Sequence, residues 1–169
     1  EAVSLAEKAF GSGSLKSISS LMLLAQIHTE LDQLEDANQI YQLSLETCVT
    51  SFGEAAPETL SVLDNYGKFL NSIDPEMAEP VFQEALRLSE EGDPQRAFRM
   101  KSVGLNLQEL GRITEAKDML SQALKAYKKF VGGKDADTID TTVKLAQLYF
   151  SQGKLKEAQE LFETALPLM

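Results

Sequence analysis

Tryptophan is absent from this chain of 169 residues, and cysteine and histidine occur once each, as Cys48 and His28. A single cysteine excludes an internal disulfide framework. One histidine and one cysteine also supply too few ligands for a zinc site, so we predict no metal and no cofactor. No apolar run approaches the roughly 20 residues that a membrane-spanning helix needs, and we predict no membrane span.

Basic residues are scarce relative to acidic ones. The chain has 16 Lys and Arg against 26 Asp and Glu, which gives a formal net charge of −10. That field repels a phosphate backbone, so we predict no nucleic-acid partner. Aromatic residues make up only 7% of the chain, a share that suits helices packed mainly through alanine and leucine.

What the chain has instead is a repeated alternation of small and bulky residues. An alanine recurs in steps of 41, 38 and 42 residues, at Ala37, Ala78, Ala116 and Ala158. Four residues after each alanine comes a bulky residue: Tyr41, Phe82, Leu120 and Phe162. Seven residues after each comes a small one: Ser44, Ala85, Ala123 and Ala165. These offsets place all three on one helix face.

A second pattern runs in phase with the first. Another small residue recurs in steps of 42, 37 and 42 residues, at Ala25, Gly67, Gly104 and Ala146. Together the two patterns predict pairs of antiparallel helices in which small residues allow close approach and bulky ones fill the remaining space. We call this predicted contact within each pair the seam.

The stretch TIDTTVKLAQLYFSQGKLKEAQELFETAL at 138–166 shows the pattern most fully. Its first helix carries Ala146 and Tyr149, and its second carries Ala158, Phe162 and Ala165. These residues resemble the tetratricopeptide repeat. The resemblance implies an all-α fold, a right-handed superhelical solenoid of antiparallel helix pairs. Repeats near 42 residues, with FGEAAPETL at 52–60 and VGGKDADTI at 131–139, look like the kinesin-light-chain variety of the family.

We predict a single array over 1–169. Its expected parts are the leading helix of a truncated repeat at 1–10, repeat one at 15–52, repeat two at 57–91, repeat three at 94–131 and repeat four at 136–167. The pairs Asp74-Pro75 and Asp93-Pro94 predict helix starts, and Gly111 and Gly153 predict helix ends. The connection between seam residues is four residues longer after repeats one and three, so we expect their second helices to be a turn longer.

Catalytic chemistry finds little support. His28 occupies the position at which other repeats carry Leu70, Leu107 and Tyr149, so we interpret it as a half-buried structural residue. We interpret Cys48 as a helix-packing thiol, because no cation near it in sequence would lower its pKa. The glycine-rich stretches 11–17 and 131–137 lack the Gly-Lys-Ser/Thr order of a phosphate-binding loop. We predict that the protein is not an enzyme.

The face of each first helix opposite the seam is predicted to line the inner, concave side of the solenoid. Lysines recur there from the second repeat onward, and nearby amides could hydrogen-bond a peptide backbone beside an apolar contact. The predicted peptide-binding residues are Asn65, Lys68, Lys101, Leu105, Lys144 and Gln147. The alternative interpretation is that these are solvated positions on a helix exterior.

The resemblance implies a non-catalytic adaptor or scaffold that binds another protein through a short linear or helical peptide, and the lysines favour an acidic one. It does not extend to the subtype that clamps chaperone C-termini, because only Asn65 matches; Met22, Gln26, Phe98 and Ser102 replace its other residues. Self-association into a homo-oligomer is the alternative function. The end at 167–169 has no polar capping helix, so we expect either a longer array or pairing between copies.

Overall fold

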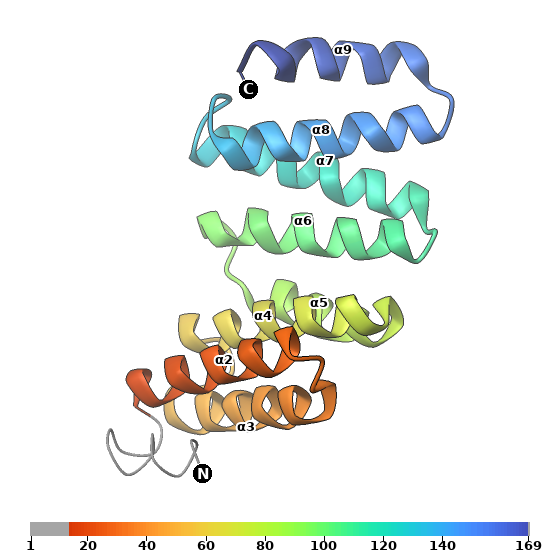
Figure 1. Cartoon of the computed structure of the whole chain (residues 1–169). Helices are drawn as coiled ribbons and strands as arrows, with labels where there is room; N and C mark the ends of the chain where they lie inside the picture. Colours follow the sequence, from red (N-terminus) through yellow and green to blue (C-terminus); the bar gives the residue numbers. More distant parts are fainter. Residues whose placement is uncertain (1–13, 169) are drawn as a thin grey trace. The chain divides into compact units, whose positions relative to one another are not determined.

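The computed structural model describes residues 14–168, which contain eight α-helices, a closing 3₁₀ helix and no strand (Figure 1). The helices are α2 (Leu15–Glu30), α3 (Leu34–Phe52), α4 (Pro57–Ile73), α5 (Pro75–Leu88), α6 (Pro94–Glu109), α7 (Ile113–Phe130), α8 (Ala136–Ser151), α9 (Leu155–Ala165) and η1 (Leu166–Leu168). The leading helix predicted at 1–10 lies outside the described residues. The chain forms two compact units that meet between Leu88 and Ser89 in sequence.

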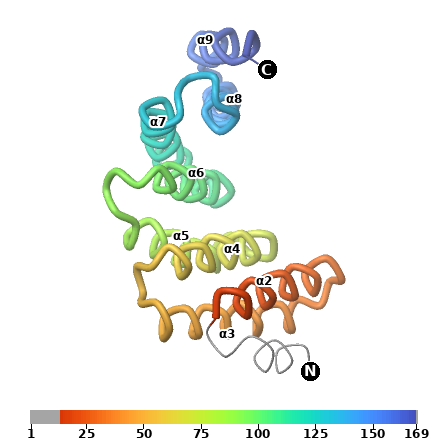
Figure 2. The backbone as a smooth tube through the Cα atoms, turned by 90° about the vertical axis from the view of Figure 1, so that its left-hand side faces the viewer, coloured from red at the N-terminus to blue at the C-terminus, as the bar shows by residue number. Residues whose placement is uncertain are grey.

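Each unit is built from two helix pairs. Unit 1 holds the pairs α2–α3 and α4–α5, and unit 2 holds α6–α7 and α8–α9. Helices that follow one another in a pair make the most extensive contacts, and the second helix of the first pair also packs on the next helix of its unit. Figure 2 shows this pairing along the backbone. The most extensive contacts thus join helices that follow one another along the chain, as a repeat architecture requires.

The seam forms as the sequence predicts. A Cβ atom built on Gly67 would lie 2.6 Å from the Phe82 ring, and one on Gly104 would lie 2.8 Å from the Leu120 side chain. The seam alanines are inaccessible to solvent: Ala25, Ala37, Ala78, Ala116, Ala123 and Ala146 are each 0% exposed. The small residues therefore allow the bulky side chains of the second helices to reach the backbone of the first.

The predicted helix ends are confirmed. The Asp93 carboxylate accepts a hydrogen bond from the backbone N–H of Gln95 at 2.9 Å, and the Asp74 carboxylate accepts one from the backbone N–H of Glu76 at the same distance. Gly111 and Gly153 adopt φ of +74° and +71° after the ends of α6 and α8, a region that favours glycine. The second helices differ in length as expected, with 19 residues in α3 and 18 in α7 against 14 in α5.

Each of the two long junctions contains an equivalent hydrogen bond from a threonine to a glycine. The Thr59 hydroxyl donates to the Gly53 carbonyl at 2.7 Å, and the Thr138 hydroxyl donates to the Gly132 carbonyl at 2.7 Å. Both glycines have positive φ, +96° and +92°. The same six-residue spacing thus ties the loop to the first turn of the next helix in both units, which explains the related text of the two junctions.

Replacing Gly67 with alanine tests the seam. The added methyl overpacks against Phe82 at a cost of about 1–3 kcal/mol, and about 1 kcal/mol of improved helix propensity offsets part of this cost. We expect Gly67→Ala to lower the free energy of unfolding of unit 1 by about 1 kcal/mol in urea denaturation.

The control is the same substitution beside a smaller partner. In a Phe82→Ala background, which removes the ring atoms that a Cβ at position 67 would meet at 2.6 and 2.7 Å, the cost of Gly67→Ala should shrink. An equal cost in both backgrounds would show that Phe82 is not what limits the side chain at position 67.

Candidate functional site: a groove between α2 and α4

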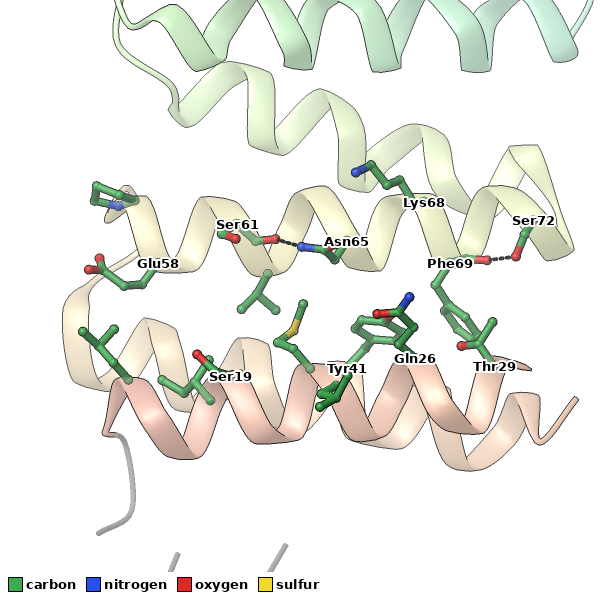
Figure 3. A pocket seen from close by; sticks show the side chains of 16 residues that line it. Ser19, Gln26, Thr29, Tyr41, Glu58, Ser61, Asn65, Lys68, Phe69 and Ser72 are labelled. Atoms are coloured by element: carbon green, nitrogen blue, oxygen red, sulfur yellow. Dashed lines mark hydrogen bonds between the residues drawn. The ribbon is translucent and has the colours of Figure 1, made fainter. Parts of the chain in front are cut away.

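An open groove of about 860 Å³ lies between α2 and α4 in unit 1 (Figure 3). It occupies helix faces outside the seam: neither Ala25 nor Gly67 lines it, and the backbone of Gly67 faces the Phe82 ring of α5. On α2 it is lined by Leu15, Ile18, Ser19, Met22, Leu23, Gln26 and Thr29, and on α4 by Pro57, Glu58, Ser61, Val62, Asn65, Lys68, Phe69 and Ser72, with Tyr41 from α3.

The floor of the groove is apolar and closely packed. Ile18, Val62, Tyr41 and Phe69 are each at most 5% exposed. The ring centroids of Tyr41 and Phe69 lie 5.0 Å apart, within the range of favourable aromatic pairs. Burial raises the pKa of Tyr41, and a hydrogen bond with the Thr29 side chain lowers it in part, so the phenol stays neutral. The floor can therefore accept an apolar side chain without offering charge.

Polar side chains stand along both edges of this floor. Figure 3 shows Ser19 and Gln26 on α2 and Ser61 and Asn65 on α4, on either side of the groove. The Asn65 amide donates one hydrogen bond to the Ser61 carbonyl at 2.8 Å, which fixes the side chain against its own helix. An asparagine amide has two N–H donors and an acceptor oxygen, so this bond leaves capacity for a ligand backbone.

Two charges of opposite sign lie on α4 along the groove. Glu58 lies in the first turn and the exposed Lys68 lies ten residues later. At about 1.5 Å of rise per residue their α-carbons are about 15 Å apart along the helix axis. A ligand in the groove therefore meets a negative side chain and, about 15 Å further along, a positive one.

Lys101 is placed differently from the prediction of a lysine offered to a ligand. Its side chain is 11% exposed, and its ammonium group lies 2.7 Å from the Asp137 carboxylate and 3.2 Å from that of Asp140. It also lies 5.6 Å from the centre of the Tyr127 ring. Lys101 thus joins α6 to the first turns of α8, and its role as a ligand contact stays a prediction.

The structure brings Asn65 and Lys68 together in the unit 1 groove. The other predicted residues belong to unit 2, where Leu105 and Lys144 are half-buried and Gln147 is exposed. Their role as ligand contacts stays a prediction. Glu58, Thr29 and Ser72 also line the groove and were not predicted. Ser61, Asn65 and Lys68 lie on one face of α4 at helical spacing. One further turn along this face in each direction reaches Glu58 and Ser72, so the same spacing could have predicted both.

His28 and Cys48 have the structural settings that were predicted for them. His28 is half-buried, with Nδ1 beside the Gln33 side-chain oxygen and 3.9 Å from Asp36. Cys48 is 0% exposed, and burial together with the Glu58 charge raises the pKa of its thiol, which disfavours the reactive thiolate. Among residues 14–168, no cluster of three or more histidine, cysteine or acidic residues could hold a metal ion.

The helix pairs, the seam and the shared junctions define an all-α helical repeat protein. A family model described as tetratricopeptide repeat matches residues 17–91 and 96–169, which together make up most of the chain. The chain belongs to the tetratricopeptide repeat family, and the predicted fold class is confirmed. A search of the curated proteins finds no match to it.

Solved structures with the same fold include kinesin-light-chain-like proteins. One is a Podosopora anserina protein described as putative kinesin light chain nearly identical TPR-like repeats. It aligns with a TM-score of 0.77 and 18% identity, over 98% of this chain and 81% of that one. BtubC (BKLC) from P. vanneervenii aligns with a TM-score of 0.81 and 21% identity, over 98% and 70%. MamA aligns with a TM-score of 0.67 and 18% identity, over 98% and 84%.

Members of the family are generally non-catalytic and serve as scaffolds for interactions between proteins, so a protein is the expected kind of partner. The similarity to kinesin-light-chain-like repeats concerns the fold. Within the part of the chain that the structure describes, no helix combines the length and apolar character needed to cross a bilayer.

Tyr127 offers a test of the environment that it shares with Lys101, Asp137 and Asp140. Its hydroxyl is buried and has no hydrogen-bond partner among the described residues. Burial, with the carboxylates of Asp137, Asp135 and Asp140, raises its pKa well above the ordinary value. The unfolded chain therefore loses this proton above about pH 10 while the folded chain keeps it, so stability falls as the pH rises beyond that point.

We expect Tyr127→Phe to leave the free energy of unfolding unchanged or slightly higher at neutral pH and to reduce the loss of stability in alkali. Tyr66→Phe is the matched control, because the Tyr66 hydroxyl donates to Asn38 at 2.8 Å and should cost about 1 kcal/mol when removed. Urea denaturation at neutral and alkaline pH measures both. A large neutral-pH cost for Tyr127→Phe would contradict the described environment.

Proposed function

We propose that this protein acts as an adaptor or scaffold and that its unit 1 binds an extended peptide segment of a partner in the groove between α2 and α4. The observation that carries the proposal is the combination of an apolar floor and polar edges in an open groove of about 860 Å³. Such a lining buries side chains of a peptide while its backbone finds hydrogen-bond partners.

The dimensions favour an extended segment. The distance of about 15 Å between the levels of Glu58 and Lys68 corresponds to four or five residues at about 3.3 Å per residue. Side chains of an extended peptide alternate, so every second one would face the floor formed by Tyr41 and Phe69. The amides of Asn65 and Gln26 would bond to backbone groups of the peptide.

The charges give the ligand a direction. An acidic residue of the peptide would lie near Lys68, and a basic residue four or five positions away would lie near Glu58. Lys68 is exposed, so its ion pair would contribute only about 0.2–1 kcal/mol. An amide hydrogen bond from Asn65 would add about 0.5–1.5 kcal/mol, and burial on the floor would supply most of the remainder.

Peptides selected from a random display library on the full chain provide the ligand for a test. In fluorescence anisotropy titrations, Asn65→Ala should weaken binding of the selected peptide by about three- to tenfold, the equivalent of one hydrogen bond. Lys68→Glu should weaken it by a similar factor and reduce its dependence on salt, because one ion pair is lost.

Two exposed positions outside the groove serve as controls. Gln83→Ala removes an amide from α5, and Lys134→Glu makes the same charge change as Lys68→Glu in the α7–α8 loop. Both should leave the affinity unchanged. If the controls weaken binding as much as the groove variants, or if Lys144→Glu alone abolishes it, the binding site lies elsewhere.

Self-association is a second candidate, favoured by one observation. Three apolar residues spaced four apart form a stripe along α2 and its C-cap, with Leu23 60%, Ile27 47% and Leu31 61% exposed. Residues at this spacing share one helix face. A second copy of the chain could cover the stripe, and Leu166, 64% exposed, offers a further apolar contact in unit 2.

Light scattering after size exclusion, run from micromolar to near-millimolar concentration, distinguishes this candidate from a monomeric adaptor. Self-association predicts a mass that rises with concentration, and Ile27→Glu with Leu31→Glu should suppress the rise because two buried apolar contacts become charged. Leu155→Glu, at an equally exposed position of α9, is the control. A constant mass of 18.6 kDa would exclude the candidate.

A further inference from the structure

The negative charge of the chain is concentrated in unit 1. Residues 1–88 include 14 acidic and 4 basic residues, whereas residues 89–169 include 12 of each. The formal net charge of −10 therefore belongs to unit 1, and unit 2 is neutral. A field of one sign attracts ligands of the opposite sign and repels those of its own sign. A peptide that approaches the unit 1 groove therefore meets a strongly acidic unit.

Unit 2 shows how a basic side chain can occupy the position equivalent to this groove. Residues at a constant spacing of 79 in sequence are equivalent in the two units, so Met22 of α2 corresponds to Lys101 of α6 and Glu58 of α4 corresponds to Asp137 of α8. The Lys101 ammonium reaches from α6 to α8 and lies 2.7 Å from the Asp137 carboxylate. Unit 2 therefore supplies its own cation to this carboxylate.

Unit 1 keeps the carboxylate but lacks the cation. Within residues 14–168, Glu58 forms no ion pair, and Met22 has no charge to offer it. Both residues line the groove, and Figure 3 shows Glu58 on the side of α4 that faces α2. Glu58 is half-buried, and a partly buried charge is stabilised when an opposite charge pairs with it. A ligand that brings a cation to this point therefore gains an ion pair.

The space beside Glu58 suits a long basic side chain. In unit 2 the Lys101 ammonium lies 5.6 Å from the centre of the Tyr127 ring. The residue equivalent to Tyr127 in unit 1 is the much smaller Cys48, and Met22 packs on the apolar cluster that contains it. The aliphatic part of a lysine or arginine can lie on Met22 while its charged end reaches Glu58.

A second acceptor lies one turn further along α4. In unit 2 the Lys101 ammonium also contacts Asp140, at 3.2 Å, and the residue equivalent to Asp140 is Ser61. Ser61 is exposed and lines the groove, and its hydroxyl can accept a hydrogen bond from an ammonium or guanidinium group. Glu58 and Ser61 thus offer one charged and one neutral acceptor to the same cation.

We propose that the unit 1 groove selects basic peptides, and that a lysine or arginine of the peptide lies on Met22 and pairs with Glu58. This preference depends on the peptide groove proposed above, because both residues act only on a peptide that lies in it. The expectation of an acidic ligand depended on three lysines, of which Lys101 and Lys144 belong to unit 2. Lys68 is left to pair with one acidic residue of a peptide that is basic as a whole.

Peptides selected on the full chain from a random display library test the preference directly. The selected peptides should be enriched in lysine and arginine relative to the unselected library and should carry a net positive charge. Their affinity should fall as the salt concentration rises, because salt screens the attraction between opposite charges.

Two variants of the full chain locate the cation. Glu58→Lys should weaken a selected peptide by about tenfold at physiological salt, because repulsion replaces an ion pair. Met22→Lys gives unit 1 the base that unit 2 has at this position, and it should weaken the same peptide by a similar factor because the new lysine pairs with Glu58.

Each variant has a matched control. Glu46→Lys makes the same charge change as Glu58→Lys at an exposed position of α3 outside the groove, and Met22→Leu keeps position 22 apolar. Both controls should change the affinity by less than about twofold, since distant exposed charges are screened. Circular dichroism checks that all four variants keep their helix content.

A change in the peptide identifies the residue that pairs with Glu58. Replacing that lysine or arginine with methionine should weaken binding to the original chain, and Glu58→Lys should then have little further effect on the methionine peptide. At any other basic residue of the peptide the two effects should add.

The preference is overturned if the selected peptides show no excess of basic residues, or if Glu58→Lys weakens binding no more than Glu46→Lys does. If Asn65→Ala still weakens binding by about three- to tenfold in that case, the groove binds a peptide of other chemistry and the proposed function stands. If neither Asn65→Ala nor Glu58→Lys has an effect, the peptide lies outside the groove and both proposals fail.

Discussion

The close approach of a small residue to a bulky one holds each helix pair together. At Gly67 and Gly104 there is no room for even a Cβ atom beside Phe82 and Leu120. In unit 1, the seam occupies one face of α2 and of α4 and leaves free the faces that line the groove. The groove between α2 and α4 is therefore a consequence of how the pairs pack, and its lining residues are set by helical periodicity.

The helix pairs, their ends and the relative lengths of the second helices could all be predicted from the sequence, because they depend on local spacing and capping. Asn65 and Lys68 could be placed on the groove for the same reason. The setting of Lys101 could not, because its carboxylate partners lie 36 and 39 residues further along the chain. Helical spacing shows which face a lysine occupies, but only the tertiary structure shows which charges meet it there.

The hydroxyl bonds of Thr59 and Thr138 to glycine carbonyls also constrain how such arrays can change in length. Inserting or deleting one residue between glycine and threonine would rotate the hydroxyl by about 100° around the next helix and break the bond. Length variation among related arrays should therefore avoid these two junctions. The connection between Leu88 and Pro94 contains no threonine, so this particular constraint does not apply there.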